Sequence, residues 1–289
     1  SEDGELRDPF KKLTTVFQMS EEMFFLHYGK DGCNRHVLID ECRELFGEIY
    51  EQIPELPFCN IWTAMQLSSR LPKGALFHMG VSNTRRCWNM FQLPESVESA
   101  CNVGCCGIDG CVSTLVGASL VNPDRLCYVV VGDLTFFYDL NSLGNHHIGT
   151  NLRVMLVNNG RGTEFRLGIH HCNVFGDDAD KYMAAAGHFG NKSPLLVKHY
   201  AEDLGFHYLS ATTKEEFMTA LSNFTNPQLS DHSMILEVFT DSKDESEALY
   251  LMSHIQSDAK GMVRSKLKDA VRNVAGEKGI NAIKKILKK

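Results

Sequence analysis

Hydrophobic and polar positions divide the chain into short apolar runs and longer stretches with helical spacing. Two runs, 127–131 (Cys-Tyr-Val-Val-Val) and 154–157 (Val-Met-Leu-Val), are rich in β-branched residues and are typical of strands buried on both faces. Further strands are expected at 75–79, 206–209 and 233–239. Helices are expected at 34–53, 60–71, 84–91, 111–120, near 136–147, and at 194–204 and 214–222. This alternation predicts a three-layer α/β/α sandwich with a mostly parallel sheet.

The two ends of the chain differ from this alternating region. Residues 1–54 and 244–289 have helical patterns, and 260–289 hold ten Lys and Arg residues but only two acids. We therefore expect an α/β domain over 55–243 with helical N- and C-terminal extensions. For the basic C-terminal extension, packing on the domain or on a partner chain is favoured over binding to a membrane surface.

Composition narrows the class of protein. The 289 residues are 43% hydrophobic and carry a net charge of −7, which argues against nucleic-acid binding as the main task. No apolar run reaches transmembrane length, and the first thirty residues lack a signal-peptide layout. The ten cysteines form no C-x-x-C pair. Reduced thiols in a cytoplasmic protein are the expected state.

Polar residues follow the two buried strands at the point where each is expected to end. Asp133 comes after Gly132, and Asn159 follows Asn158 at 26 positions beyond Asp133. The carboxyl ends of parallel strands meet at one edge of a sheet, where ligands bind. An acid and an amide there suit Mg²⁺ that carries a diphosphate. A Gly-Asp pair also commonly caps a helix, so the interpretation depends on both pairs together.

This arrangement resembles the diphosphate-binding domain of enzymes that depend on thiamine diphosphate (ThDP), in which Gly-Asp is followed by Asn-Asn. Residues 132–141 are similar to one branch, the menaquinone-pathway 2-succinyl-5-enolpyruvyl-6-hydroxy-3-cyclohexene-1-carboxylate synthase (SEPHCHC synthase). The resemblance implies ThDP and Mg²⁺ as cofactors. It also implies that Asp133, Asn159 and the backbone carbonyl of Arg161 bind the metal.

Two further motifs match the family. Gly80-Val81-Ser82 is followed by an arginine four positions after the serine, and Cys106-Gly107-Ile108-Asp109-Gly110 resembles the glycine-rich turn whose aliphatic residue bends the cofactor. The resemblance implies a substrate contact from Arg86. It implies cofactor contacts from Ser82, Gly107, Ile108, Asp109, Gly132, Asp133, Leu134, Thr135, Asn159, Arg161, Gly162, Thr163, Glu164 and Phe165.

Two positions depart from the synthase pattern. Val103 stands near the place of an arginine that helps to hold a substrate carboxylate, and Glu164 replaces an aliphatic residue before Phe165. Valine cannot clamp a carboxylate as a guanidinium does. The identities of the 2-oxoacid and of the acceptor therefore stay open.

The resemblance implies the diphosphate-binding half of a ThDP-dependent 2-oxoacid decarboxylase or carboligase. In that family the activating glutamate lies on a pyrimidine-binding domain of the same or another chain, so no catalytic residue is assigned here. Because residues 1–30 resemble the end of a middle domain, we expect a fragment without turnover of its own. A homodimer or homotetramer is expected. The alternative is a non-catalytic nucleotide-binding or scaffold domain that retains the fold.

Overall fold

The computed structural model describes residues 2–29, 37–104, 106–167, 170–183 and 193–255. The chain divides into two compact units, Ser1–Gln52 and Ile53–Lys289. The basic segment 260–289 lies outside the described residues, so the expectation for its packing remains a prediction.

The first unit contains two helices, α1 (Glu21–Tyr28) and α2 (Val37–Glu51). The hydroxyl of Ser20 caps α1 by accepting a hydrogen bond from the Met23 backbone N–H at 3.2 Å. Phe17 packs its ring against α1, with its centroid 5.2 Å from that of Phe24. The helix expected at 34–53 is confirmed over the part that the structure describes.

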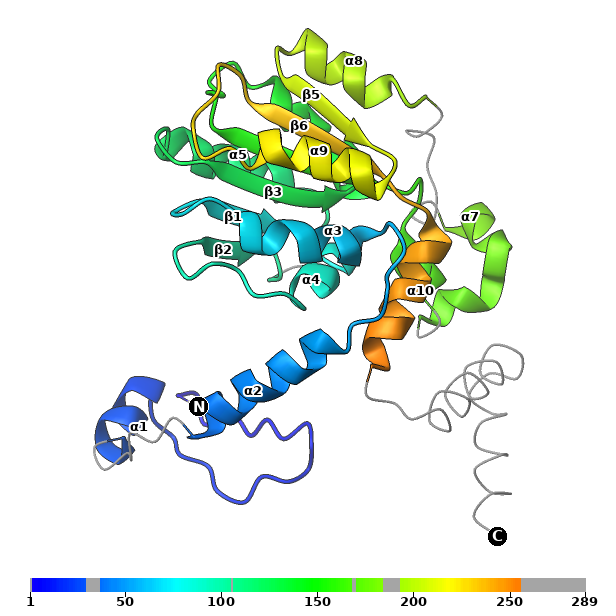
Figure 1. Ribbon diagram of the computed structural model, residues 1–289. Coiled ribbons are helices and arrows are strands. Elements are labelled where there is room, and N and C mark those ends of the chain that lie inside the picture. The colour runs from blue at the N-terminus through cyan, green and yellow to red at the C-terminus, as the bar shows by residue number, and fades with distance from the viewer. Residues whose placement is uncertain (1, 30–36, 105, 168–169, 184–192, 256–289) are drawn as a thin grey trace. The chain divides into compact units, whose positions relative to one another are not determined.

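A parallel sheet of six strands forms the centre of the second unit (Figure 1). Its strands are β1 (Leu76–Met79), β2 (Glu98–Cys101), β3 (Cys127–Gly132), β4 (Leu152–Asn158), β5 (His207–Ala211) and β6 (Met234–Phe239). They lie in the order β2-β1-β3-β4-β6-β5, and every neighbouring pair is parallel. The chain leaves β1 toward β2 on one side and continues from β3 on the other, so the order reverses between β1 and β3.

Helices cover both faces of this sheet, which confirms the three-layer α/β/α sandwich. One face carries α3 (Asn60–Leu67), α4 (Asn83–Trp88) and α9 (Lys214–Phe224), whereas the other carries α5 (Cys111–Val121), α6 (Asp133–Asp139) and α8 (Leu196–Asp203). Figure 1 shows α3 and α9 in front of the sheet and α5 behind it. The last described helix, α10 (Ser242–Ser253), follows β6 and packs against α3.

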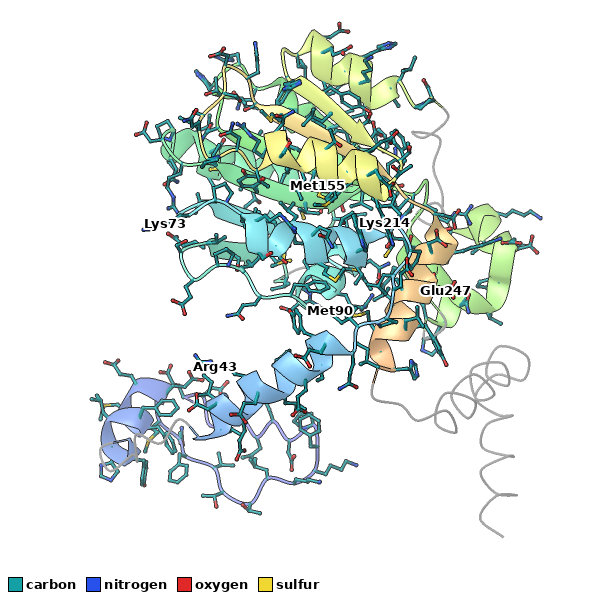
Figure 2. The ribbon with its side chains drawn as sticks, viewed as in Figure 1. Arg43, Lys73, Met90, Met155, Lys214 and Glu247 are labelled. Carbon is teal, nitrogen blue, oxygen red and sulfur yellow. The ribbon has the colours of Figure 1, made fainter. Side chains whose placement is uncertain are left out.

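Alternating residues of the central strands feed two separate hydrophobic clusters. Tyr128 and Val130 of β3 join the cluster under α3 and α9, whereas Val129 joins the cluster under α5. Met155 of β4 is fully buried in the first cluster, and Figure 2 shows it beneath α9. Lys214, at the start of α9, lies over the ring of Trp62 in α3. Because both faces of β3 and β4 are buried, the sequences of these strands are continuous apolar runs.

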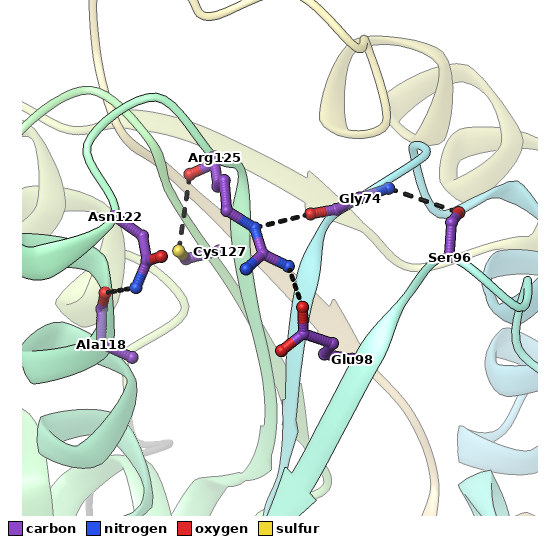
Figure 3. Close-up of polar contacts among 7 residues, drawn as sticks. All are labelled: Gly74, Ser96, Glu98, Ala118, Asn122, Arg125 and Cys127. Carbon is purple, nitrogen blue, oxygen red and sulfur yellow. Dashed lines mark hydrogen bonds and ion pairs between the residues drawn. The ribbon is translucent and has the colours of Figure 1, made fainter.

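The edge strand β2 was not expected from the sequence. Its residues, Glu-Ser-Ala-Cys, lack an apolar run because three of the four positions are exposed. Backbone pairing and one side chain hold its amino end: Arg125 donates from Nε to the carbonyl of Gly74 at 2.8 Å and from Nη2 to Glu98 at 3.0 Å (Figure 3). Tertiary contacts therefore fix a strand that local propensity does not specify.

Most element boundaries differ from the expectation by a few residues, and two of the differences lie at the ends of strands. The helix expected near 136–147 begins earlier, at Asp133, and continues after Asp139 as the tighter helix η2 (Leu140–Gly144). The strand expected at 206–209 runs over β5, His207–Ala211. The long segment after β4 contains η3 (Thr163–Arg166), η4 (His171–Asp178) and α7 (Ala179–Tyr182).

Candidate functional site

A pocket of about 280 Å³ lies at the carboxyl ends of β1, β3 and β4, next to the reversal of strand order. This is the edge at which open α/β sheets bind ligands. Most of the residues that the sequence singles out line it: Ser82, Ile108, Gly132, Asp133, Leu134, Thr135, Asn159, Arg161, Gly162, Thr163, Glu164 and Phe165. Chain segments more than eighty positions apart are thus brought together.

Other singled-out residues lie beside the pocket and not in its wall. Arg86 contacts a wall residue, as described below, while Gly107 and Asp109 support the turn that carries Ile108. A Cβ atom on Gly107 would lie 2.5 Å from Oδ1 of Asp109, so any other residue at this position would displace that exposed carboxylate. Val103 is 43% exposed and does not line the pocket.

Asp133 joins the ends of β3 and β4. Its carboxylate is only 2% exposed, and it accepts hydrogen bonds from the backbone N–H of Leu134 at 2.8 Å and of Gly160 at 2.6 Å. The Gly160 backbone has a φ of 80°, which a side chain would strain. A buried carboxylate held in this way by backbone N–H groups is a hard oxygen donor of the kind that Mg²⁺ prefers.

Asn159 follows the end of β4 and turns its side chain back on the loop. Its Oδ1 accepts a hydrogen bond from the Arg161 backbone N–H at 3.3 Å, and both residues line the pocket. Within the described ranges, no group of three or more His, Cys, Asp and Glu side chains could hold a metal ion. The predicted set differs from such a group because it combines one carboxylate with an amide oxygen and a backbone carbonyl.

Thr163 lines the pocket and carries an unsatisfied polar group. The residue is 5% exposed, and in the part of the chain that the structure describes its Oγ1 has no hydrogen-bond partner. Leaving a buried hydroxyl without a partner costs roughly 1–3 kcal/mol. A ligand with an acceptor atom in this pocket would remove that cost.

Backbone strain is also found at this pocket. Ser82 has a φ of 61° and Cys106 a φ of 52°, and both line the cavity. Among the described residues other than glycine, only Lys11 also has a positive φ. Conformations of this kind cost about 1–3 kcal/mol and are concentrated at ligand-binding sites.

Arg86 and Glu164 form an ion pair at the pocket wall. Nη1 of Arg86 lies 2.7 Å from Oε2 of Glu164, and Nη2 lies 3.2 Å from Oε1. Nη1 also donates to Oδ1 of Asn83 at 2.7 Å. The Glu164 carboxylate raises the pKa of Arg86 above its ordinary value. The charged pair is therefore bidentate, and no local pattern predicts it because the two residues lie 78 positions apart in the sequence.

The pocket wall also contains residues that the sequence analysis did not assign to a site, notably Asn60 at the start of α3 and Glu245 on α10. The Glu245 carboxylate accepts the backbone N–H of Asn60 at 3.0 and 3.1 Å and the hydroxyl of Thr240 at 2.6 Å. Oδ1 of Asn60 in turn accepts the indole N–H of Trp88 at 3.0 Å. These bonds tie α10 to the carboxyl edge of the sheet.

Glu245 is the most strongly perturbed acid of the pocket. Burial raises its pKa to about 7, and the nearby Asp244 adds to the increase, while the hydrogen bonds from Thr240 and Asn60 oppose it. The residue is 2% exposed, so loss of hydration outweighs the three bonds that favour the charged form. A carboxyl group in this state can hold or release a proton near neutral pH.

The described residues include no helix that is both long and apolar enough to cross a membrane. No family model matches the chain.

Curated proteins do match it. The chain is 32% identical over 255 residues to the SEPHCHC synthase of Bacteroides fragilis, which is 86% of this chain and 43% of that protein. It is 31% identical to the synthase of Phocaeicola vulgatus over 86% of this chain and 42% of that protein. It is 33% identical to that of Christiangramia forsetii over 69% of this chain and 33% of that protein.

The chain thus spans less than half the length of the curated relatives that it matches. Within that span the similarity covers most of the second unit, including the pocket, because no match covering 86% of the chain could omit it. The resemblance that the motifs predict is confirmed, and the chain belongs to the family of the 2-succinyl-5-enolpyruvyl-6-hydroxy-3-cyclohexene-1-carboxylate synthases over the part of them that it spans.

Proposed function

We propose that this chain provides the diphosphate-binding half of a ThDP-dependent 2-oxoacid decarboxylase or carboligase. The observation that carries the proposal is the convergence of Asp133, Asn159 and Thr163 on one pocket at the carboxyl edge of the sheet. The acid is buried at the pocket and held by two backbone N–H groups, and the threonine hydroxyl is buried without a partner among the described residues. Both are features of a site that a polar ligand completes.

The residues present fit Mg²⁺ and a diphosphate. Mg²⁺ takes oxygen ligands and shares its coordination shell with phosphate oxygens. The Asp133 carboxylate, the Asn159 amide oxygen and the Arg161 carbonyl would supply the protein oxygens. The hydroxyls of Thr163, Thr135 and Ser82, which all line the pocket, would donate to diphosphate oxygens. Asp133 thereby has the central role, since it is the one carboxylate of this set.

Bound ThDP supplies a thiazolium ring that accepts the electrons left when a 2-oxoacid loses CO₂. The chain's own contribution is to bind, to orient and to exclude water. Ile108 and Phe165 give the pocket an apolar wall, and Glu164 and Arg86 lie at the place proposed for the substrate. The proposal includes an activating glutamate from a pyrimidine-binding domain, presented within a homodimer or homotetramer. It follows that the chain has no turnover without that domain.

Calorimetric titration of ThDP into the full chain, with and without Mg²⁺, tests this proposal. We expect Mg²⁺-dependent binding that falls at least 100-fold in Asp133→Asn, because the amide keeps the side-chain volume but lacks the charge that the cation requires. Asp203→Asn, on the exposed surface of α8, is the matched control and should bind as the unchanged chain does. Equal binding by Asp133→Asn and the unchanged chain would contradict the proposed metal site.

A second candidate is a non-catalytic domain that keeps this fold as a scaffold or nucleotide-binding unit. The Arg86–Glu164 pair is the observation that favours it, because a substrate-binding arginine is already occupied. The same titration separates the two functions. A scaffold has no need of Mg²⁺-dependent ThDP binding, whereas a nucleotide-binding unit would prefer ADP with Mg²⁺ to ThDP.

A further inference from the structure

The guanidinium of Arg86 is a group that binds anions, and here it is paired with the carboxylate of Glu164. A guanidinium has five N–H donors in a planar fork that suits a carboxylate. At Arg86, Nη1 donates to both Asn83 and Glu164, and Nη2 donates to the second oxygen of Glu164. One edge of the fork, formed by Nη1 and Nη2, is thus already paired with a carboxylate of the same chain.

The charges at this place cancel. An incoming carboxylate that replaced Glu164 on Arg86 would leave the displaced side chain in the pocket wall as a second negative charge. Such a replacement exchanges one ion pair for another and adds repulsion between two carboxylates. A carboxylate that instead accepted from the remaining N–H groups of Arg86 would meet a pair without net charge and the same repulsion, so an anionic group gains little from Arg86 while Glu164 is present.

A hydroxyl group has no such conflict. The paired Arg86 keeps its Nε–H and one Nη2–H for an acceptor, and the paired Glu164 keeps lone pairs for a donor. A hydroxyl is both donor and acceptor, so it complements the pair without breaking it. Glu164 lines the pocket, and the Arg86 side chain beside it is 37% exposed, so a ligand that extends from the pocket past Glu164 can meet both.

We propose that Glu164 is a specificity-determining residue: it keeps Arg86 in an internal ion pair, so that the substrate presents an uncharged, hydroxyl-bearing group here and not a carboxylate. This inference rests on the proposed function, because it names the substrate class of the same site. Arg161 also lines the pocket and carries a positive charge, so an anionic group elsewhere on the substrate is compatible with it.

A matched pair of 2-oxoacids tests the proposal. 2-Oxoglutarate ends in a carboxylate, and 5-hydroxy-2-oxopentanoate has the same chain length but ends in a hydroxyl. Each is titrated calorimetrically into the full chain saturated with Mg²⁺ and ThDP, for the unchanged chain and for Glu164→Leu, Arg86→Leu and the double variant. We expect the unchanged chain to bind the hydroxy acid at least as tightly as 2-oxoglutarate. Glu164→Leu should tighten 2-oxoglutarate binding about tenfold, and the double variant should lose that gain.

Two results would overturn the inference. One is that Arg86→Leu alone weakens 2-oxoglutarate binding fivefold or more, which would mean that Arg86 already serves a carboxylate. The other is that Glu164→Leu brings no Arg86-dependent gain, including the case in which neither acid binds any variant. Glu164→Gln, which keeps the shape and removes the charge, should give a smaller gain in the same direction. Thermal melts of all variants verify folding, and a part-exposed pair contributes little to stability.

The cofactor titration keeps the two proposals distinguishable. If ThDP fails to bind while 2-oxoglutarate, titrated alone, still shows the Glu164→Leu gain, the proposed function fails and the role of Glu164 stands. If ThDP binds with Mg²⁺ and the gain is absent, the proposed function stands and the role of Glu164 fails.

Discussion

The pocket combines two regions whose polar side chains differ in burial and in their hydrogen-bond partners. Three groups of the pocket are buried, with exposed fractions between 2% and 5%: Asp133, Thr163 and Glu245. Backbone N–H groups and a hydroxyl donate to Asp133 and Glu245. The hydroxyl of Thr163 has no partner among the described residues. The Arg86–Glu164 pair is part-exposed and its members satisfy each other. Thr163 therefore gains most from a ligand, because Asp133, Glu245 and the members of the pair already have partners among the described residues.

The two regions also differ in how closely their residues follow the family pattern. Asp133, Asn159 and Thr163 line the pocket, and the resemblance implies that all three contact the cofactor or its metal. The position of Glu164 departs from the family's aliphatic residue, and its carboxylate pairs with the arginine expected to contact substrate. One substitution thus changes the chemistry at the pair and leaves the buried groups untouched.

The largest effect is expected from Glu245, the buried group whose pKa burial raises to about 7. The folded chain keeps a proton on this carboxyl that the unfolded chain releases near pH 4.5. Its contribution to stability is therefore fully present below that pH and is lost as the pH rises toward 7. The difference is on the order of 3 kcal/mol in the free energy of unfolding.

Glu245→Gln should remove this pH dependence, because the amide is neutral throughout. Denaturant unfolding at pH 5 and pH 8 measures it: the unchanged chain should lose stability relative to the variant between the two values. Glu247→Gln is the matched control, since Glu247 lies exposed on the same helix, as Figure 2 shows. Parallel pH profiles for Glu245→Gln and the unchanged chain would show that Glu245 is ionised already at pH 5.

The next effect concerns Asn159, which links the buried groups to the proposed metal. Asn159→Leu keeps the approximate volume of the side chain and removes the amide oxygen. We expect Mg²⁺-dependent ThDP affinity to fall about 100-fold, or about 2.7 kcal/mol, because the cation loses a protein ligand. Asn223→Leu, exposed on α9, should bind as the unchanged chain does. A change of less than threefold in Asn159→Leu would remove Asn159 from the metal site.

The fold and the buried groups differ in how far the sequence reveals them. β3 and β4 are predicted correctly because burial on both faces requires continuous apolar runs. β2 is not, since an exposed edge strand needs no such run. Asp133 and Asn159 are found because a strand end is a local signal, and the pocket confirms that they lie together.

Contacts between distant segments have no local signal of that kind. Glu245 lies 185 positions from Asn60 in an acidic stretch that resembles a solvated helix surface. A hint does exist, because Ala248 and Leu249 follow Glu245 at the spacing of one helix face, and both are buried. The Arg86–Glu164 pair offers no hint of this type, since each residue alone is compatible with an exposed charge.

The smallest effect, and the sharpest test of the contrast, is expected at Thr163. Thr163→Val keeps the shape and removes the hydroxyl. Because Oγ1 is buried without a partner, its removal should leave the free energy of unfolding unchanged or raise it by up to about 1 kcal/mol. The same change should weaken ThDP binding about tenfold, because the diphosphate loses a donor. Thr163→Ser keeps the hydroxyl and should retain the affinity. Weaker binding together with undiminished stability would identify Thr163 as a group placed for the ligand, whereas a loss of stability in Thr163→Val would mean that its hydroxyl has a partner within the protein.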